Sequence, residues 1–365
     1  MTNASPDNAS SWIATAVAGG QGAAGGVLVL SRDDVLRCVT EIDVVDVVRT
    51  TLAEHDRGHC VLPSEAYLPW RNAEGAYSRS IAMPGAVVPA CGPPRYGMKI
   101  INASVSNPAI GLERAGGIGL CFDSQTARIT TIMEVGVLSA LRTAAVSAAG
   151  VEVAGYDRAG AVSVIGCGMQ GRVHVFLLLE RLAKLGRISL FDQNEPAARR
   201  LADQVARARP DVEVVVLSSA RQAVAAGDIV ITTTTVSEGY VEPDWIAQDA
   251  LVVNVSLADL TDEALLGAGA LYVDDVELIA ENPRRPLGRL LRENRLGVPG
   301  QQDGPRKRID ATIGGLITGR YQPVTTAGGY AVLNPFGMSV LDVAVLDAVR
   351  CQAVSAGLGT ELWLG

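Results

Sequence analysis

The sequence has few aromatic residues, few cysteines and no excess of basic residues, and each shortage excludes a class of protein. Aromatic residues make up 4% and charged residues 19% of the 365 positions, whereas apolar residues make up 48%. This balance excludes a disordered chain and fits a compact enzyme of about two domains. The formal charge of −8 argues against a nucleic-acid partner.

Two further shortages concern disulfides and metals. The six cysteines are scattered without a CxxC pair, too few for a disulfide framework in a chain of this length, so we expect reduced thiols in a cytoplasmic protein. Of the three histidines, His55 and His59 lie four residues apart, but no acidic cluster elsewhere matches them. We therefore expect no metal site. The most apolar long stretch, residues 135–154, contains Arg142 and Glu152, which are costly in lipid, and we expect no membrane span.

Changes of pattern along the chain predict an α/β protein with two domains. Residues 1–26 are rich in Ala, Gly and Ser and are expected to be a flexible tail. Residues 27–150 mix a helical pattern with strand-like pieces, which is typical of an α+β domain. Residues 151–326 alternate short apolar runs with helical patterns, which predicts a Rossmann-type doubly wound parallel sheet. Residues 327–365 are expected to pack back on the first domain. Six strands are predicted in the sheet: 162–165, 187–191, 213–216, 228–232, 250–255 and 270–273.

The strongest single motif is a glycine-rich turn between a predicted strand and a predicted helix. The turn contains Gly166, Gly168, Met169, Gln170 and Gly171. Glycines permit a tight turn and a close approach of the backbone to a pyrophosphate, and the helix N-terminus supplies unpaired N–H groups. Asp192, 21 residues after Gly171, ends the next strand, where a carboxylate accepts hydrogen bonds from a ribose 2′-OH and repels a 2′-phosphate. The motif predicts a dinucleotide site that prefers NAD to NADP; the alternative is that Asp192 only begins a turn with Asn194.

Hydroxyl side chains are expected around this cofactor. A run of four threonines, Thr232 to Thr235, ends a predicted strand. Hydroxyls at this edge of a parallel sheet can contact the nicotinamide or ribose, although the run also fits an ordinary β-branched strand end. The side chains that we expect at the cofactor are Thr143, Thr233, Thr234 and Ser256.

The segment Leu141-Arg-Thr-Ala-Ala145, followed by a Rossmann unit that begins Val164-Ile-Gly-Cys-Gly-Met-Gln-Gly171, resembles the ornithine cyclodeaminase/μ-crystallin superfamily. The resemblance extends from about Leu28 to Leu346. Residues 79–85 and 97–99 match the segments that line the amino-acid pocket in this family, and 254–259 match the strand end that carries its acidic catalytic residue. The family also implies a homodimer.

The resemblance implies roles for five residues that their chemistry supports. Arg142 offers a bidentate fork for the carboxylate of an amino-acid substrate, and Arg79 and Arg114 are candidates for further carboxylates. A desolvated Lys99 beside the cofactor can polarise an imine or help to activate water. Asp259, at the C-terminal end of a parallel strand, can accept a proton from the substrate amine as hydride leaves the α-carbon.

The surroundings of Asp259 depart from the cyclodeaminase pattern. Cyclodeaminases place Gly-Gly before this aspartate and Cys/Ser-Pro-Gly-Lys after it, whereas this chain has Ser256-Leu-Ala before and Leu260-Thr after. Residues 113–116 and 334–342 resemble instead the subgroup that oxidises N-(2-amino-2-carboxyethyl)-L-glutamate with NAD, giving 2-oxoglutarate and L-2,3-diaminopropionate for siderophores and peptide antibiotics. An ornithine or lysine cyclodeaminase and a non-catalytic, NAD-dependent ligand binder like the μ-crystallins are the alternatives. Residues 284–308 contain eight basic side chains and are predicted to be a solvated loop or, alternatively, a flap over an anionic substrate.

Overall fold

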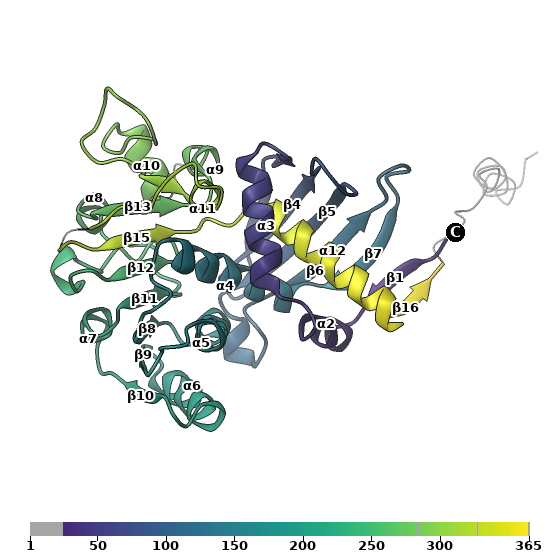
Figure 1. The fold of residues 1–365 in the computed structure, drawn as a ribbon. Coiled ribbons are helices and arrows are strands. Elements are labelled where there is room, and N and C mark those ends of the chain that lie inside the picture. The colour runs from purple at the N-terminus through teal and green to yellow at the C-terminus, as the bar shows by residue number, and fades with distance from the viewer. Residues whose placement is uncertain (1–24, 283–284, 327, 364–365) are drawn as a thin grey trace, which may run out of the picture.

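The computed structural model describes residues 25–282, 285–326 and 328–363, which form two sheets with helices packed against them (Figure 1). The first sheet has the order β16-β1-β7-β6-β5-β4-β2, with β3 paired to β4. Its pairs are antiparallel except β1 with β7. Its strands are β1 (Val27–Leu30), β2 (Cys60–Val61), β3 (Ala66–Arg71), β4 (Tyr77–Val87), β5 (Arg95–Ser104), β6 (Ala115–Phe122), β7 (Ile129–Glu134) and β16 (Thr360–Leu362).

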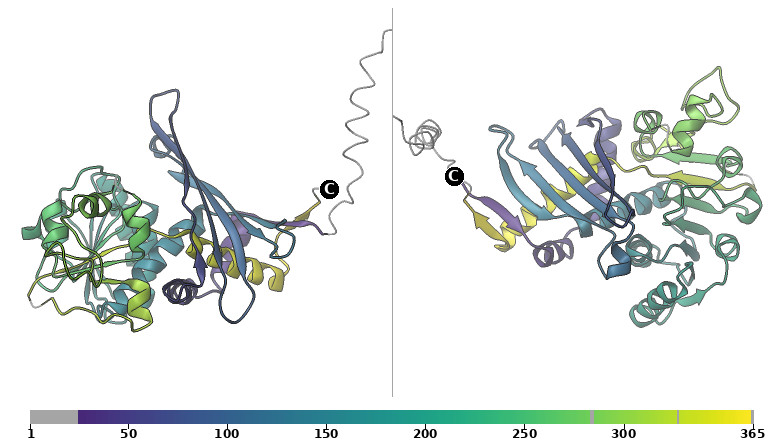
Figure 2. Two further views of the ribbon diagram at one scale, coloured as in Figure 1. Left: turned by 90° about the horizontal axis from the view of Figure 1, so that it is seen from above. Right: turned by 180° about the vertical axis from the view of Figure 1, so that it is seen from behind.

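Helices cover one face of this first sheet and leave the other face bare. The first lobe contains α2 (Arg32–Val39), α3 (Val44–Asp56), η1 (Asn107–Ile110), α4 (Gly136–Val153) and α12 (Ser339–Ala356). Helix α12 lies along β4, β5 and β6, and α3 packs against α12 and α4. Seen from behind, the strands lie in front of α12 with no helix between them and the viewer (Figure 2).

The second sheet is entirely parallel and has the order β10-β9-β8-β11-β12-β15-β13-β14. Its strands are β8 (Ala161–Ile165), β9 (Arg187–Phe191), β10 (Glu213–Val216), β11 (Ile229–Thr232), β12 (Leu251–Asn254), β13 (Ala270–Val273), β14 (Ala311–Thr312) and β15 (Ala331–Asn334). Its helices are α5 (Met169–Arg181), α6 (Glu195–Ala208), α7 (Ala220–Ala225), η2 (Pro243–Trp245), α8 (Asp262–Leu266), α9 (Val276–Ala280), α10 (Pro286–Arg292) and α11 (Ile313–Ile317). All six predicted strands are confirmed, as is the Rossmann-type fold class. The chain reverses its direction across the sheet beside β8, which is where such folds bind ligands.

The C-terminal segment contributes strands to both sheets, whereas the prediction placed 327–365 on the first domain. Helix α12 and strand β16 lie in the first lobe, but β15 is inserted between β12 and β13 of the second sheet. The reason is that Ala331–Asn334 is fully apolar except for its last residue, a pattern that suits a strand buried on both faces. The tail expected at 1–26 lies, apart from Gly25 and Gly26, outside the described residues.

Helix α4 connects the two lobes. By length and composition this 18-residue helix could span a membrane, but it is mostly buried inside the protein. It contacts α3 and α12 on one side and α5 and β15 on the other. We therefore interpret it as a core helix.

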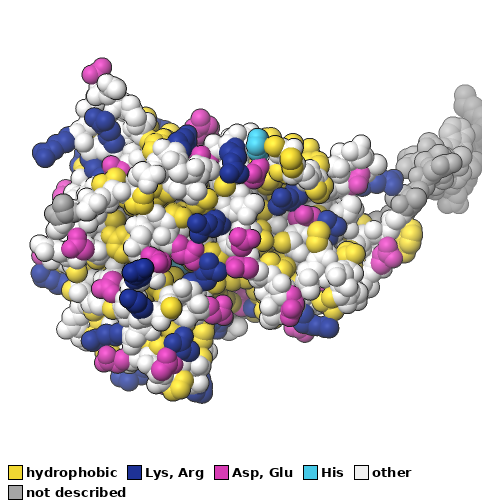
Figure 3. Space-filling model, in the orientation of Figure 1, with side chains coloured by type: hydrophobic (Ala, Val, Ile, Leu, Met, Phe, Trp, Pro, Cys, Tyr) yellow, Lys and Arg dark blue, Asp and Glu magenta, His cyan; other side chains and the backbone are white. Residues whose placement is uncertain are grey.

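The surface carries both signs of charge in close mixture. Basic and acidic side chains alternate across the face drawn in Figure 3, without a continuous basic field. This distribution, with the net charge of −8, does not suit a nucleic-acid backbone. All six cysteines are unpaired.

The two lobes are tied together at the C-terminal end of α3. The imidazole Nε2 of His55 lies 2.7 Å from Oδ2 of Asp275, the residue that caps α9. Asp56 accepts a hydrogen bond of 2.7 Å from Thr318 and pairs with Arg320. Burial by itself lowers the pKa of His55, but interactions with Asp275 and, second to it, with Cys60 outweigh this effect and raise the pKa to about 10.

This pair predicts a pH-dependent stability. A histidine with a raised folded-state pKa stabilises the protein fully below its unfolded pKa of about 6.5 and loses this effect as pH rises toward the folded value. We expect wild type to exceed His55→Gln in free energy of unfolding by about 3 kcal/mol near pH 6, and the difference to shrink as pH rises toward 10. Urea denaturation across this range measures it. The control is His59→Gln, since His59 pairs with Glu54 of the same lobe; a constant His55→Gln difference over the whole range contradicts the prediction.

Candidate functional site

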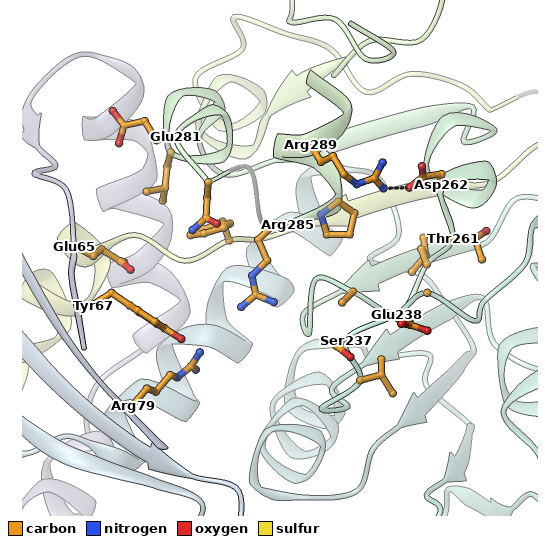
Figure 4. A pocket seen from close by; sticks show the side chains of 18 of the residues that line it. Glu65, Tyr67, Arg79, Ser237, Glu238, Thr261, Asp262, Glu281, Arg285 and Arg289 are labelled. Atoms are coloured by element: carbon orange, nitrogen blue, oxygen red, sulfur yellow. Dashed lines mark hydrogen bonds and ion pairs between the residues drawn. The ribbon is translucent and has the colours of Figure 1, made fainter. Parts of the chain in front are cut away.

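A cleft of about 1050 Å³ lies between the first lobe and the carboxyl ends of the parallel strands (Figure 4). Glu65, Tyr67 and Arg79 line it from the first lobe. The loops after β11, β12 and β15 and the helix α10 line it from the second lobe. The cleft therefore lies where open α/β sheets bind ligands.

The glycine-rich turn between β8 and α5 has the geometry of a dinucleotide cradle. Gly168 is the N-cap of α5, and no side chain caps this helix N-terminus. A Cβ atom at Gly171 would overlap the carbonyl oxygen of Gly166, so only glycine permits this close packing of helix on strand. A Cβ atom at Gly168 would meet nothing within 4 Å, which leaves space for a ligand beside the turn. Met169 and Gln170 form the first turn of α5, and the buried amide oxygen of Gln170 has no hydrogen-bond partner. These residues fit a dinucleotide pyrophosphate.

Asp192 follows β9 and faces the glycine turn. Its Oδ2 accepts a hydrogen bond of 2.7 Å from the backbone N–H of Cys167, and its Oδ1 accepts one of 2.8 Å from that of Asn194. The carboxylate thus makes the turn contact with Asn194 that the alternative interpretation requires, and also lies beside the glycine turn as a ribose ligand would. The position of Asp192 is therefore compatible both with a contact to the cofactor ribose and with a turn that it begins with Asn194.

The four hydroxyl residues expected at the cofactor have different partners. Thr233 donates to the carbonyl of Gly166 at 2.7 Å and so braces the turn. Thr234 and Ser256 both donate to the Asp259 carboxylate. Thr143 donates to the carbonyl of Ser139 within α4, at 2.8 Å. The structure brings three of them together at the ends of β11 and β12, while Thr143 is bound back to its own helix.

Asp259 is fully buried just beyond the carboxyl end of β12, with a carboxylate held by hydroxyl donors. Besides Thr234 (2.6 Å) and Ser256, the Tyr240 hydroxyl donates to it at 3.0 Å. Burial and the Asp259 charge raise the pKa of Tyr240, so Tyr240 stays a donor at neutral pH. Tyr240 was not predicted, because its loop carries no motif. Leu257 has φ 69°, a conformation that favours glycine, which gives a structural reason for the Gly-Gly of cyclodeaminases at this turn.

Lys99 and Arg142 converge on one carboxylate, that of Asp342 on α12. Lys99 Nζ lies 2.7 Å from Oδ2 and Arg142 Nε lies 2.7 Å from Oδ1, and all three side chains are at most 7% exposed. Burial and the Arg142 charge lower the pKa of Lys99 to about 8, against the opposing effects of Asp342 and Glu65. The two predicted residues thus lie together, and Asp342 is a third member that the sequence did not reveal.

The loop after β15 completes this cluster. Asp274, at the end of β13, accepts backbone hydrogen bonds from Phe336 (3.0 Å) and Gly337 (2.6 Å). Gly337 has φ 96°, and a Cβ atom there would lie 2.5 Å from Nη1 of Arg142. Only glycine therefore lets this loop lie against the guanidinium. The insertion of β15 into the second sheet is what carries residues 335–342 to the site.

Glu65 is a further acidic group that sequence reasoning missed. It is partly buried in the cleft wall. Burial raises its pKa, whereas the charges of Lys99 and Arg142 oppose this rise. A carboxyl group with a raised pKa near a lysine with a lowered pKa is an arrangement suited to proton transfer. The sequence offers little indication of this role, because Glu65 precedes a short strand whose residues are all exposed.

Arg79 and Arg114 form a positively charged group with Arg285, which was not predicted as a site residue. Partial desolvation and the charges of Arg79 and Arg285 lower the pKa of Arg114, and burial and Arg79 lower that of Arg285. The stretch 284–308 is neither a solvated loop nor a flap throughout, because it contains helix α10, whose Arg289 pairs with Asp262 at 2.5 Å. Arg284 lies outside the described residues.

The histidine pair considered as a metal ligand is divided between two acids. His55 pairs with Asp275 and His59 with Glu54, both at 2.7 Å. The described residues contain no group of three or more metal-ligating side chains.

Comparisons with known proteins agree with this geometry. The model of the ornithine cyclodeaminase/mu-crystallin family matches residues 27–357. The N-((2S)-2-amino-2-carboxyethyl)-L-glutamate dehydrogenase of Staphylococcus aureus is 28% identical over 320 residues, covering 87% of this chain and 92% of that protein. The nodulation efficiency protein NfeD of Rhizobium meliloti is 27% identical over 339 residues, covering 91% and 97%.

Solved structures show the same fold. The crystal structure of CmnK has a TM-score of 0.84 and 43% sequence identity, covering 94% of this chain and 100% of that one. An archaeal alanine dehydrogenase dimer with bound NAD has a TM-score of 0.77 and 21% identity, covering 93% and 99%. With the family match over most of its length, the chain belongs to the ornithine cyclodeaminase/mu-crystallin family.

Proposed function

We propose that the protein oxidises N-(2-amino-2-carboxyethyl)-L-glutamate with NAD and releases 2-oxoglutarate and L-2,3-diaminopropionate, a siderophore or peptide-antibiotic precursor. The observation that carries the proposal is a set of cations in and beside the cleft, of which Arg79 and Arg285 line its wall from the two lobes. Lys99 and Arg142 share a single carboxylate, and Arg79 and Arg114 lie nearby. A substrate with three carboxylates can pair with Arg79 and Arg285, which no carboxylate of the described residues does, as well as with Arg142, whereas a monocarboxylate amino acid cannot. The similarity to the S. aureus dehydrogenase supports the same reaction.

The cofactor would be held by the glycine turn and the residues around it. Gly166, Gly168 and Gly171 would hold the pyrophosphate against the α5 N-terminus, and Asp192 would hold the ribose and disfavour a 2′-phosphate. Met169, Gln170, Thr143, Thr233, Thr234 and Ser256 are the further residues proposed to contact it. When bound, NAD accepts the hydride that leaves the substrate α-carbon.

The protein's own groups would handle carboxylates and protons. Arg142, Arg79 and Arg114 would hold the substrate carboxylates. Asp259, fixed by its hydroxyl donors, would accept the proton of the secondary amine as the C=N bond of the imine forms. Lys99 would polarise the imine while water adds to its carbon; a proton returns to nitrogen, the C–N bond breaks, and the ketone and the free amine result.

A redox assay tests this proposal. Purified protein is incubated with NAD or NADP and, separately, with the glutamate–diaminopropionate conjugate, ornithine and lysine, while absorbance of reduced nicotinamide is followed. We expect NADH with the conjugate only, in equal amount to 2-oxoglutarate, and at least tenfold less product with NADP. Proline or pipecolate without net NADH would establish the cyclodeaminase alternative, and NAD binding without any turnover would establish the binding-protein alternative.

We further propose a cytoplasmic homodimer that forms through the bare face of the first sheet. The register of β3 to β6 puts Leu68, Trp70, Met98, Ile100 and Ile118 on this face. Leu68 is 63% and Ile118 41% exposed. These exposed apolar side chains, which lie beside Ser80 and Asn102 on the same face, favour a protein partner, and a second copy offers the same face. The archaeal alanine dehydrogenase of the same fold is a dimer.

Placing a charge in the middle of this face should separate the protomers. For Ile118→Asp we expect the dissociation constant of the dimer to rise at least 100-fold, because a buried unpaired carboxylate would replace an apolar contact. Sedimentation velocity over a range of concentrations measures it. Val354→Asp on α12, an exposed position outside the face, is the matched control and should stay dimeric. A wild type that sediments as a monomer would disprove the proposal.

A further inference from the structure

Two guanidinium groups, those of Arg79 and Arg285, face one another across the cleft from the two lobes, with Arg114 near them. Arg79 extends from β4, and Arg285 from the N-cap of α10. In Figure 4 these two side chains point toward one another across the space beside Tyr67. Arg114, which directly precedes β6, is close enough for the charges of Arg79 and Arg285 to lower its pKa.

These cations lack the acidic partners that their neighbours have. No carboxylate of the described residues lies within ion-pair distance of Arg79, Arg114 or Arg285. On the same short helix, Arg289 pairs with Asp262 and Glu293. Like charges held together in a partly desolvated cleft destabilise the protein unless an anion binds between them. The absence of a carboxylate partner for these arginines in the described part of the chain therefore indicates a site for an anionic ligand.

The charge balance indicates what kind of anion fits. Lys99 and Arg142 share Asp342, which leaves one net positive charge for one substrate carboxylate when the nearby Glu65, whose pKa is raised by burial, is protonated. Arg79 and Arg285, which no carboxylate of the described residues pairs with, remain for a second carboxylate. Tyr67, which bonds to Tyr77 and Arg79, adds a hydroxyl beside them.

From this geometry we infer that Arg285, together with Arg79, forms a subsite that spans the cleft and selects substrates and products with a second carboxylate. The inference rests on the proposed function for the identity of the natural ligand, but the selectivity for dicarboxylates can be measured without turnover. Because Arg285 comes from the second lobe, a ligand held by the subsite also joins the two lobes.

The test compares two 2-oxoacids that differ by one carboxylate. Binding of 2-oxoglutarate and of 2-oxopentanoate to the full-length protein with NADH is measured by calorimetry. We expect wild type to bind 2-oxoglutarate at least tenfold more tightly. We expect Arg285→Gln to reduce this ratio about tenfold while changing 2-oxopentanoate affinity less than twofold. Arg289→Gln, on the same helix and in the same cleft wall, is the matched control and should keep the wild-type ratio.

Each outcome decides the inference. A wild-type ratio near one, or an unchanged ratio in Arg285→Gln, overturns it. Arg285→Lys, which keeps the charge but not the planar fork, should give an intermediate ratio and serves if Arg285→Gln folds poorly. If the ratio depends on Arg285 but the conjugate yields no NADH, the proposed reaction fails and the dicarboxylate subsite stands. If NADH forms but the affinity ratio is the same in wild type and Arg285→Gln, the proposed reaction is supported and the subsite is disproved.

Discussion

Replacing Asp259 with asparagine should lower kcat for the conjugate by about 10²- to 10⁴-fold. The amide keeps the size and accepts hydrogen bonds from Thr234 and Tyr240 through its oxygen, but it cannot take the proton of the substrate amine. Asp259 is fully buried, so no solvent base can replace it easily. NADH formation under saturating substrate measures the loss.

Two companion measurements separate a lost base from a damaged site. NAD affinity of Asp259→Asn should stay within threefold of wild type, because the glycine turn is held by Thr233 and not by Asp259. Tyr240→Phe removes one donor and leaves the base, so it should lower kcat only about tenfold. An Asp259→Asn enzyme with more than a tenth of the wild-type kcat would show that another group takes the proton.

The second sheet could be predicted because residues close together in the sequence determine each of its strands. Each strand from β8 to β13 is a short apolar run followed by a helical pattern, and buried parallel strands need no partner-specific sequence. The glycine turn and Asp192 are likewise readable, since a cradle for a pyrophosphate and a carboxylate at the next strand end are both set by residues close in sequence. Lys99, Arg142 and Asp259 were found through family motifs, and their burial agrees with placement in a site.

The partners of these residues could not be predicted, because they come from distant parts of the chain. Asp342 lies 200 positions after Arg142, with which it pairs. It reaches the site only because β15 inserts between β12 and β13, and the apolar run of β15 suits a buried strand without specifying which two strands it lies between. Arg285 lies in a basic stretch whose composition favours a solvated loop. Only the packing of α10 shows that Arg289 pairs with Asp262 and Glu293 whereas Arg285 faces the cleft without such a partner among the described residues. Periodicity predicts elements, whereas contacts across the cleft depend on how elements pack.

Replacing Asp342 with asparagine should have the largest effect on stability. Lys99 and Arg142 would then be two buried cations without their shared counter-ion, and breaking a buried pair on one side destabilises by about 3–5 kcal/mol. Urea denaturation at neutral pH measures the loss. The matched control is Asp347→Asn on the same helix, where the pair with Arg350 lies partly in solvent and removal should cost less than about 1 kcal/mol.

The same variant should change the pH dependence of the reaction through Lys99. Asp342 opposes the lowering of the Lys99 pKa, so its removal should move that pKa from about 8 to a lower value. If protonated Lys99 polarises the imine, kcat of wild type falls as pH rises through about 8, and in Asp342→Asn this fall begins at lower pH. Lys99→Met should abolish the transition in both backgrounds. An Asp342→Asn profile that keeps the wild-type midpoint, with stability lost as expected, would mean that Asp342 supports the fold of the site without tuning the lysine.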